Sequence, residues 1–298
     1  MQEMLSDIDS IGNNQTLYQE KNFNARTEAI DHLDFHIIDR IQARMEKTGQ
    51  TTQLRDLKQY AEKTKHLLED VNTRMFSRLR KEISQGAHKG AGLIKLIDEY
   101  FDHNLNAFLQ QETIGYDNLD IFINGLLSNQ RLPVDTKELD PEMVYYQKTP
   151  VRIVLAFIQR AELTATDIFF DLGSGLGQVT ILVNLLTSVM SKGVEIDAGF
   201  YSYAKACAAE LNLHAIEFIN HDARAVDYST ATVFFMYTPF EGKILQEVLH
   251  ILSGEAKIRK IRIYTYGPCA SELAKQEWLM NKTAAKGKKE IFGEFISC

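Results

Sequence analysis

Cysteine is scarce in this sequence. The 298 residues contain three cysteines, Cys207, Cys269 and Cys298, an odd number with no paired spacing. A disulfide framework needs an even set, and a zinc site needs ligands at short fixed spacings, so the sequence predicts neither. Free thiols persist in a reducing compartment. We therefore expect a protein without a metal site, in a reducing environment.

Long apolar runs are missing as well. No stretch of the sequence approaches the roughly 20 residues that a bilayer-spanning helix requires. The first nine residues hold acid where a secretory signal needs positive charge. The sequence therefore predicts a cytoplasmic protein with no membrane partner.

An excess of positive charge is the third absence. Residues 1–150 hold 18 Lys and Arg against 24 Asp and Glu, and residues 151–298 hold 15 against 16. A general nucleic-acid binder presents a basic body to the phosphates, so nucleic acid is not indicated as a partner. The basic clusters at 74–81 and 282–289 are interpreted as solvated faces. The pair His32 and His36 lies on the polar face of a predicted helix and receives the same interpretation.

The two parts of the chain differ in their apolar period. Before about residue 130 the period is helical, whereas after about residue 165 short apolar strands alternate with helices, which is typical of an α/β domain. The predicted N-terminal helices cover residues 26–47, 53–84, 93–111 and 118–127. A polar stretch with two prolines, at 128–141, is the predicted connection. We predict an all-helical domain over residues 1–140, acting as a cap or as a platform for substrate or partner, and a second domain over 141–298.

A strand, a glycine loop and a helix follow one another in the second domain. Residues 167–172 form an apolar run that predicts a buried parallel strand. The loop Gly173-Ser-Gly-Leu-Gly177 follows at once, and an apolar helix continues from Gln178. Glycine lets the chain pass close to a ligand, and a helix start presents free backbone amides. This order predicts a nucleotide-type ligand site.

The spacing of the glycines separates two classes of ligand. A dinucleotide-binding loop reads G-x-G-x-x-G. Here the third glycine comes one position early, at Gly177, and Gln178 stands where that pattern has glycine. A nucleotide-dependent oxidoreductase stays open as an alternative that this spacing argues against.

Two acids follow the next two predicted strands. Glu195 lies about twenty residues after the loop, where a carboxylate can accept both hydroxyls of a ribose. Asp222 follows the predicted strand at 216–220, from which an acid can reach an adenine amino group. The carboxyl ends of parallel strands meet at one edge of a sheet. Both acids are therefore expected beside the glycine loop.

The segment from Asp171 to Gly177 resembles the first signature of class I S-adenosylmethionine (SAM)-dependent methyltransferases, an acid followed by x-G-x-G-x-G. Extended to Val179, and followed by Gly193-Val-Glu195, it is similar in particular to the non-SET histone lysine methyltransferases of telomeric silencing and their bacterial look-alikes. The resemblance covers Tyr145 to the end. It implies a Rossmann-like sheet of seven strands, the last one antiparallel and paired in a final hairpin, with SAM as cofactor and S-adenosylhomocysteine as product. The cofactor-binding residues that it implies are Tyr146, Thr149, Asp171, Gly173, Ser174, Gly175, Gly177, Gln178, Glu195, Ile196, Asp222, Ala223 and Tyr237.

The segment before the loop has two interpretations. Thr149 is a good N-cap and Pro150 a good first residue for a helix that ends near Ala161. The resemblance implies instead that Tyr146, Thr149 and Pro150 cap the methionine carboxylate of SAM. Asp171 would sit beneath the loop and bind backbone amides or the SAM amino group.

The segment Tyr237-Thr-Pro-Phe240 follows the predicted fourth strand, at the edge where ligands bind. Amino-group methyltransferases of the resembled class have Asn or Asp, then two prolines and an aromatic residue, in this place. This chain lacks the Asn or Asp and the second proline. Tyr237 is therefore the catalytic candidate, to orient the nucleophile or stack on it.

The acceptor stays open. The acidic N-terminal half favours a basic protein, so we expect a lysine-like side-chain amine. Methylation of a small molecule or a nucleic acid is an alternative, as is a non-catalytic protein that binds SAM and a partner. Methyl transfer asks mainly for an aligned nucleophile, which positioning supplies.

Overall fold

The computed structural model describes residues 1–298 except 50, 102–114, 129, 134–141 and 284–291. Its contacts divide the chain into two compact units. One comprises the described residues of 1–82 and 94–112, and the other those of 83–93 and 113–298. The predicted domain boundary at residue 140 falls outside the described residues and stays a prediction.

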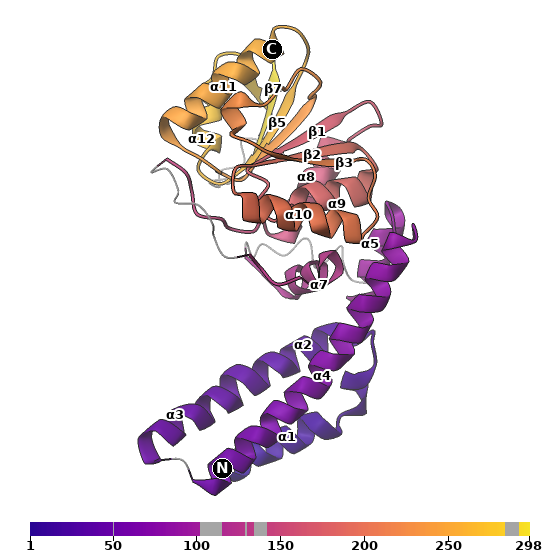
Figure 1. Ribbon diagram of the computed structural model, residues 1–298, viewed down its shortest axis with the longest axis vertical. Helices are drawn as coiled ribbons and strands as arrows, with labels where there is room; N and C mark the ends of the chain where they lie inside the picture. Colours follow the sequence, from indigo (N-terminus) through magenta and orange to yellow (C-terminus); the bar gives the residue numbers. More distant parts are fainter. Residues whose placement is uncertain (50, 102–114, 129, 134–141, 284–291) are drawn as a thin grey trace. The chain divides into compact units, whose positions relative to one another are not determined.

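The first unit consists of helices whose apolar stripes pack against each other (Figure 1). Its elements, with α4 and α5 in part, are α1 (Gln2–Asn13), η1 (Gln15–Tyr18), α2 (Phe23–Asp31), the π-helix η2 (His32–Ile38), α3 (Asp39–Thr48), α4 (Thr52–Ser84) and α5 (Ala91–Tyr100). Leu33, Ile37 and Ile41 are buried, as are Ala61 and Leu68 of α4. Burial of such stripes, rather than intrinsic propensity, stabilises helices of this kind.

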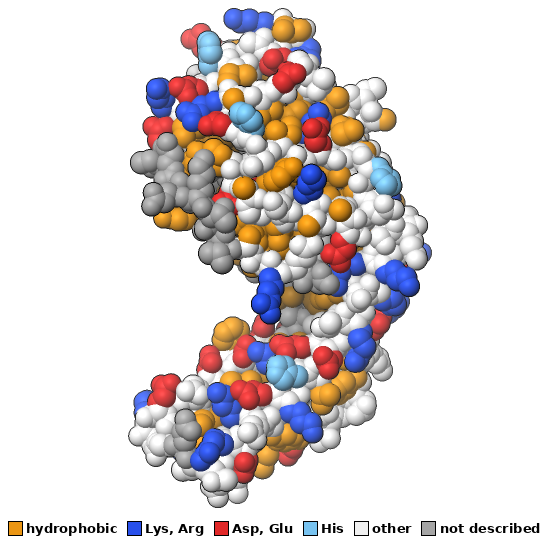
Figure 2. Space-filling model, viewed as in Figure 1, with side chains coloured by type: hydrophobic (Ala, Val, Ile, Leu, Met, Phe, Trp, Pro, Cys, Tyr) orange, Lys and Arg blue, Asp and Glu red, His pale blue; other side chains and the backbone are white. Residues whose placement is uncertain are grey.

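The helix predictions for this part of the chain agree with the structure in different degrees. The helix predicted at 53–84 is α4, and the one predicted at 26–47 is present as α2, η2 and α3 in continuation. The helix predicted at 93–111 is described only as far as Tyr100, within α5. Acidic and basic side chains are interspersed over the face of this unit that Figure 2 shows.

A seven-stranded sheet forms the second unit, in the order β3-β2-β1-β4-β5-β7-β6. The strands are β1 (Ile168–Leu172), β2 (Met190–Glu195), β3 (Ile216–Asn220), β4 (Val233–Met236), β5 (Arg262–Tyr266), β6 (Leu279–Asn281) and β7 (Phe292–Ser297). The first five strands are parallel, and β7 runs antiparallel between β5 and β6. The predicted Rossmann-like sheet with an antiparallel last strand is confirmed.

Helices cover both faces of this sheet (Figure 1). The helices of this unit are α7 (Asn118–Leu127), α8 (Val151–Ala161), α9 (Gln178–Thr187), α10 (Ala198–Glu210), α11 (Gly242–Ala256) and α12 (Ala270–Leu273), with the short η3 (Ala223–Ala225). Of these, α7 packs on α8 and α9. On one face, Phe157 of α8 packs its ring 5.4 Å from that of Phe169, between centroids. On the other face, Phe170 shares a buried cluster with Leu245 and Val248 of α11. Successive strand residues point to opposite faces, so adjacent phenylalanines hold both layers.

Helix α8 begins differently from the prediction. Its N-cap is Pro150 rather than Thr149, and no side chain of the cap residue bonds to the helix. Instead, the Val151 backbone N–H donates to the Asp120 carboxylate on α7, over 2.9 Å. The N-cap role of Thr149 is therefore wrong, because an acid distant in sequence already satisfies the free amide.

Among the described residues, no helix combines the length and the apolar character that crossing a membrane requires.

Candidate functional site

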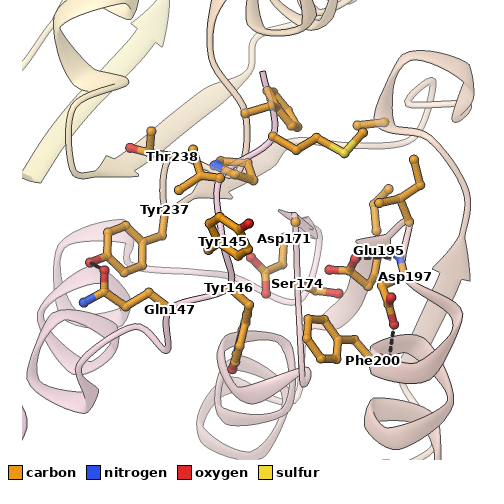
Figure 3. Close-up of a pocket in the computed structure, with 18 of the residues that line it drawn as sticks. Tyr145, Tyr146, Gln147, Asp171, Ser174, Glu195, Asp197, Phe200, Tyr237 and Thr238 are labelled. Carbon is orange, nitrogen blue, oxygen red and sulfur yellow. Dashed lines mark hydrogen bonds between the residues drawn. The ribbon is translucent and has the colours of Figure 1, made fainter. Parts of the chain in front are cut away.

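A cavity of about 330 Å³ opens at the carboxyl ends of the central strands (Figure 3). Most of the predicted cofactor-binding residues line it: Tyr146, Thr149, Asp171, Gly173, Ser174, Gln178, Glu195, Ile196, Asp222, Ala223 and Tyr237. The other two, Gly175 and Gly177, do not line it. The structure thus brings together segments that lie far apart in the sequence, from Tyr146 to Tyr237.

The glycine loop turns sharply where β1 ends. The N–H groups of Gly173 and Ser174 both donate to the Val194 carbonyl of β2, each over 2.9 Å. Gly175 has a φ of +52°, and a Cβ there would lie 2.1 Å from the ring of Tyr146. Only glycine accommodates both the left-handed backbone and this approach. The bare backbone at Gly175 therefore seats Tyr146, whose ring packs 5.1 Å from that of Phe200 between centroids.

Glu195 connects the loop to the end of β2. One of its carboxylate oxygens accepts the N–H of Gly175 at 2.7 Å, and the other accepts the N–H of Asp197 at 2.8 Å. Each oxygen keeps a lone pair for a further donor, and the two hydroxyls of a ribose could be these donors. Burial raises the pKa of Glu195. Figure 3 shows Glu195 and Asp197 side by side against the cavity.

Asp171 is buried beneath the loop and accepts the Thr180 hydroxyl of α9 at 2.9 Å. Burial raises its pKa to about 7, with the nearby Glu195 carboxylate adding to the effect. A strongly perturbed carboxyl pKa at a cavity is typical of a functional site.

Asp222 lines the cavity, but its carboxylate is already paired. Arg224 donates its backbone N–H and Nε to one oxygen, at 2.8 and 3.0 Å, and its Nη2 to the other at 2.7 Å. The predicted contact with an adenine amino group stays a prediction. The sequence interpretation missed this arginine, although an acid two residues before it is a common local turn pattern.

Aromatic rings lie at the mouth of the cavity. Tyr145 lines the cavity with 78% of its surface exposed. The Tyr237 hydroxyl donates to the side chain of Gln147, which also lines the cavity, at 3.0 Å (Figure 3). The Tyr237 ring packs 4.6 Å from that of Tyr266 between centroids. Thr238 holds a φ of +37°, which β-branched residues rarely adopt and which fits backbone strain at a ligand site. Of these residues, the sequence interpretation named only Tyr237.

Backbone hydrogen bonds join the two segments that carry these tyrosines. Val144 N–H donates to the Pro239 carbonyl at 3.2 Å, and Glu241 N–H donates to the Glu142 carbonyl at 2.8 Å. The Glu142 carboxylate accepts the N–H of Ile244 at 2.9 Å. These hydrogen bonds therefore fix the segment before α8 against the residues that follow β4.

The cavity suits a positively charged ligand. The carboxylates of Asp171, Glu195, Asp197, Asp222 and Glu241 line it, and no lysine or arginine of the described residues does. The Ser174 hydroxyl and the whole Gln178 side-chain amide are buried without a protein partner in the described part of the chain. Buried polar groups are normally paired, so these atoms indicate a polar ligand. SAM, with its sulfonium and ammonium groups, fits this set of residues.

Residues 141–253 match the family model of the histone methylation protein DOT1. The chain is a SAM-dependent methyltransferase. The match spans well under half of the sequence, and it confirms the resemblance seen in the glycine loop. No curated protein matches the chain.

Several solved structures are similar to this methyltransferase. An RNA methyltransferase from Salinibacter ruber, in complex with S-adenosyl-L-homocysteine, is 21% identical over 51% of this chain and 92% of its own, with a TM-score of 0.41. The human methyltransferase 10 domain containing protein is 16% identical over 50% and 82%, with a TM-score of 0.39. A ribosomal protein L11 methylase from Lactobacillus delbrueckii subsp. bulgaricus is 15% identical over 49% and 77%, with a TM-score of 0.39. Values this low do not bear on the acceptor.

SAM binding is expected to strengthen with pH across neutrality. With a pKa of about 7, Asp171 is mostly neutral at pH 6 and mostly ionised at pH 8. A bound ammonium group favours the ionised form, so the Kd for SAM should fall about tenfold between these pH values. Isothermal titration calorimetry across this range measures the change.

Asp171 has the opposite effect on the stability of the ligand-free protein, which should fall as the pH rises. A carboxyl with a pKa raised above its unfolded value of about 3.9 favours the folded state below that pH, and this contribution disappears as the pH rises through about 7. Asp171→Asn should flatten the pH dependence of SAM binding, and Asp227→Asn, at an exposed acid outside the cavity, should preserve it. A wild-type Kd that is constant from pH 6 to pH 8 would contradict this role of Asp171.

Proposed function

We propose that the chain transfers the methyl group of SAM to a lysine side chain of a basic protein. The observation that carries this proposal is the acidic lining of the cavity, which has five carboxyl side chains, one of them paired with Arg224, and no lysine or arginine of the described residues. Such a surface attracts a cationic amine and repels phosphate. The description of the matched family model, a histone methylation protein, supports the same class of acceptor.

The aromatic mouth supports an amine in a second way. An ammonium group is attracted to the face of a tyrosine ring, and Tyr145 and Tyr237 both line the cavity. Bound SAM supplies an electrophilic methyl group. The chain's own residues would orient the amine, since an in-line approach at close distance accounts for much of the rate. The amine must also lose its proton to present a lone pair.

The test is transfer of labelled methyl groups from SAM to a lysine-rich protein such as a core histone. We expect ε-N-methyllysine on mass spectrometry, and no label on the same protein after chemical blocking of its lysines. Label found only in RNA or in a small molecule would overturn the proposed acceptor. SAM binding without any labelled product would favour a non-catalytic SAM-binding protein.

Tyr237→Ala is expected to lower kcat/KM for the protein acceptor about 30-fold, the equivalent of a desolvated cation–π contact. Tyr237→Phe should keep most of the activity, because it keeps the ring and loses only a hydroxyl that donates to Gln147. Tyr201→Ala, at a tyrosine of α10 that does not line the cavity, is the matched control. Initial rates at varied acceptor concentration measure the effect, and an unchanged rate for Tyr237→Ala would exclude the ring from acceptor binding.

A further inference from the structure

A threonine side chain, that of Thr238, joins the turn after β4 to the end of β5. Its hydroxyl donates to the Tyr266 carbonyl at 3.2 Å and accepts the backbone N–H of Cys269 at 3.2 Å. Thr238 is 4% exposed, so both hydrogen bonds are formed with little access of water. Thr238 lines the cavity, and Figure 3 shows it next to Tyr237. The hydroxyl thus ties together the exits of two neighbouring strands.

The backbone at Thr238 is strained. Its φ of +37° lies in the left-handed region, which is unfavourable for a β-branched residue and persists only where the surrounding contacts enforce it. Gly267, directly after β5, leaves room for these contacts, since a Cβ there would lie 2.7 Å from the Thr238 hydroxyl oxygen. The two hydrogen bonds of the hydroxyl are therefore the contacts that hold the turn in this conformation.

The residues on either side of Thr238 both line the cavity. The ring of Tyr237 packs 4.6 Å from that of Tyr266, between centroids. Pro239 packs on the glycine loop, where a Cβ at Gly173 would lie 2.2 Å from the Cβ of the proline. Backbone angles set the direction of neighbouring side chains, so a turn that relaxed would move the Tyr237 ring from its place at the mouth.

We propose that Thr238 is a positioning residue for methyl transfer. Its hydroxyl holds the strained turn, and the turn holds the Tyr237 ring where the acceptor amine enters. Alignment of the nucleophile accounts for much of the rate, so a displaced ring lowers the rate without any loss of chemistry at Thr238 itself. The effect on transfer rests on the proposed function, whereas the position of the ring is measurable without any acceptor.

The first test places meta-fluorotyrosine at position 237 of the full chain and records fluorine NMR without ligand. In the wild type we expect a resonance displaced from that of free fluorotyrosine by the neighbouring Tyr266 ring. Thr238→Val keeps the branched shape and removes both hydrogen bonds, so its resonance should move toward the free value. Thr238→Ser keeps the hydroxyl and should retain the wild-type shift. Thr238→Ala replaces the valine variant if that one fails to fold.

Thr64→Val is the matched control. Thr64 is also 4% exposed, and its hydroxyl donates to the Tyr60 carbonyl at 3.0 Å within α4. It does not line the cavity. The fluorine shift at position 237 and the rate of methyl transfer should both stay at their wild-type values in this variant.

The second test is the kinetics of methyl transfer to a core histone. Thr238→Val should lower kcat/KM for the histone about 10-fold. The Kd for SAM should stay within about threefold of the wild type, because the Gly173 N–H is bonded to the Val194 carbonyl and not to the turn. In a Tyr237→Ala background the same substitution should lower kcat/KM less than about twofold, because the ring through which it acts is gone.

A wild-type fluorine shift in Thr238→Val would overturn the proposal. Equal losses of kcat/KM in the wild-type and Tyr237→Ala backgrounds would also overturn it, because Thr238 would then act without the ring. A wild-type chain that transfers no methyl group to the histone would instead overturn the proposed acceptor, and the fluorine shift would then decide the role of Thr238 by itself.

Discussion

Gly175→Ala is expected to weaken SAM binding by about 100-fold. The added Cβ would lie 2.1 Å from the Tyr146 ring, on a backbone whose φ of +52° is itself unfavourable for alanine. Strain of this kind amounts to about 1–3 kcal/mol, and relieving it displaces the Tyr146 ring from the cavity wall or withdraws the N–H that Glu195 accepts. Calorimetry with SAM and with S-adenosylhomocysteine measures the loss.

The control for this variant is Gly254→Ala in α11. No atom lies within 4 Å of the Cβ that it adds, and the position is helical with an ordinary φ. We expect unchanged SAM affinity and a free energy of unfolding higher by up to about 1 kcal/mol, since alanine is the better helix former. A Gly175→Ala protein that binds SAM as tightly as the wild type would show that the loop adopts another conformation.

Glu195→Gln is expected to remove most SAM binding, also by about 100-fold, while leaving the protein folded. The amide has the shape of the carboxylate, but its NH2 group must face one of two backbone donors, Gly175 or Asp197. An amide NH2 facing a backbone N–H replaces a hydrogen bond with a repulsive contact between two donors, beside the site where a ribose would bind. SAM affinity by calorimetry and the melting temperature, with and without SAM, separate the two effects.

The melting temperature without ligand should change little in Glu195→Gln. Burial raises the pKa of Glu195, so its charge is unfavourable to folding, and a neutral side chain offsets the lost hydrogen bonds. Glu217→Gln, at a β3 glutamate that pairs with Lys192 over 2.9 Å, is the control and should keep SAM binding. A Glu195→Gln protein that SAM still stabilises against heat would contradict the role of this carboxylate.

The strands of the second unit were predictable because each is a short apolar run with a clear end. Parallel strands align their carboxyl ends, so the positions of Asp171, Glu195 and Asp222 in the sequence were enough to place them at one cavity. The final hairpin was implied by the family resemblance, and the structure contains it as β6 and β7. Periodicity also gave α4 and α7, whose apolar faces are long and regular.

What the sequence did not reveal depends on contacts between distant residues. Helix α1, which buries Met4 and Ile8, was not predicted. The cap of α8 comes from Asp120 on another helix, and the Tyr237 hydroxyl is held by Gln147, 90 residues earlier. No local pattern carries such pairings.

The backbone bonds between residues 142–144 and 239–241 have a consequence for how this enzyme class diversifies. Main-chain N–H and C=O groups, which depend little on the identity of the side chain, fix the path of both segments. Side chains such as those of Tyr145, Gln147 and Tyr237 therefore project from a scaffold whose geometry does not depend on them. Substituting them would change which acceptor fits the cavity without displacing the backbone that forms it. Single substitutions at these positions are therefore expected to alter acceptor selectivity.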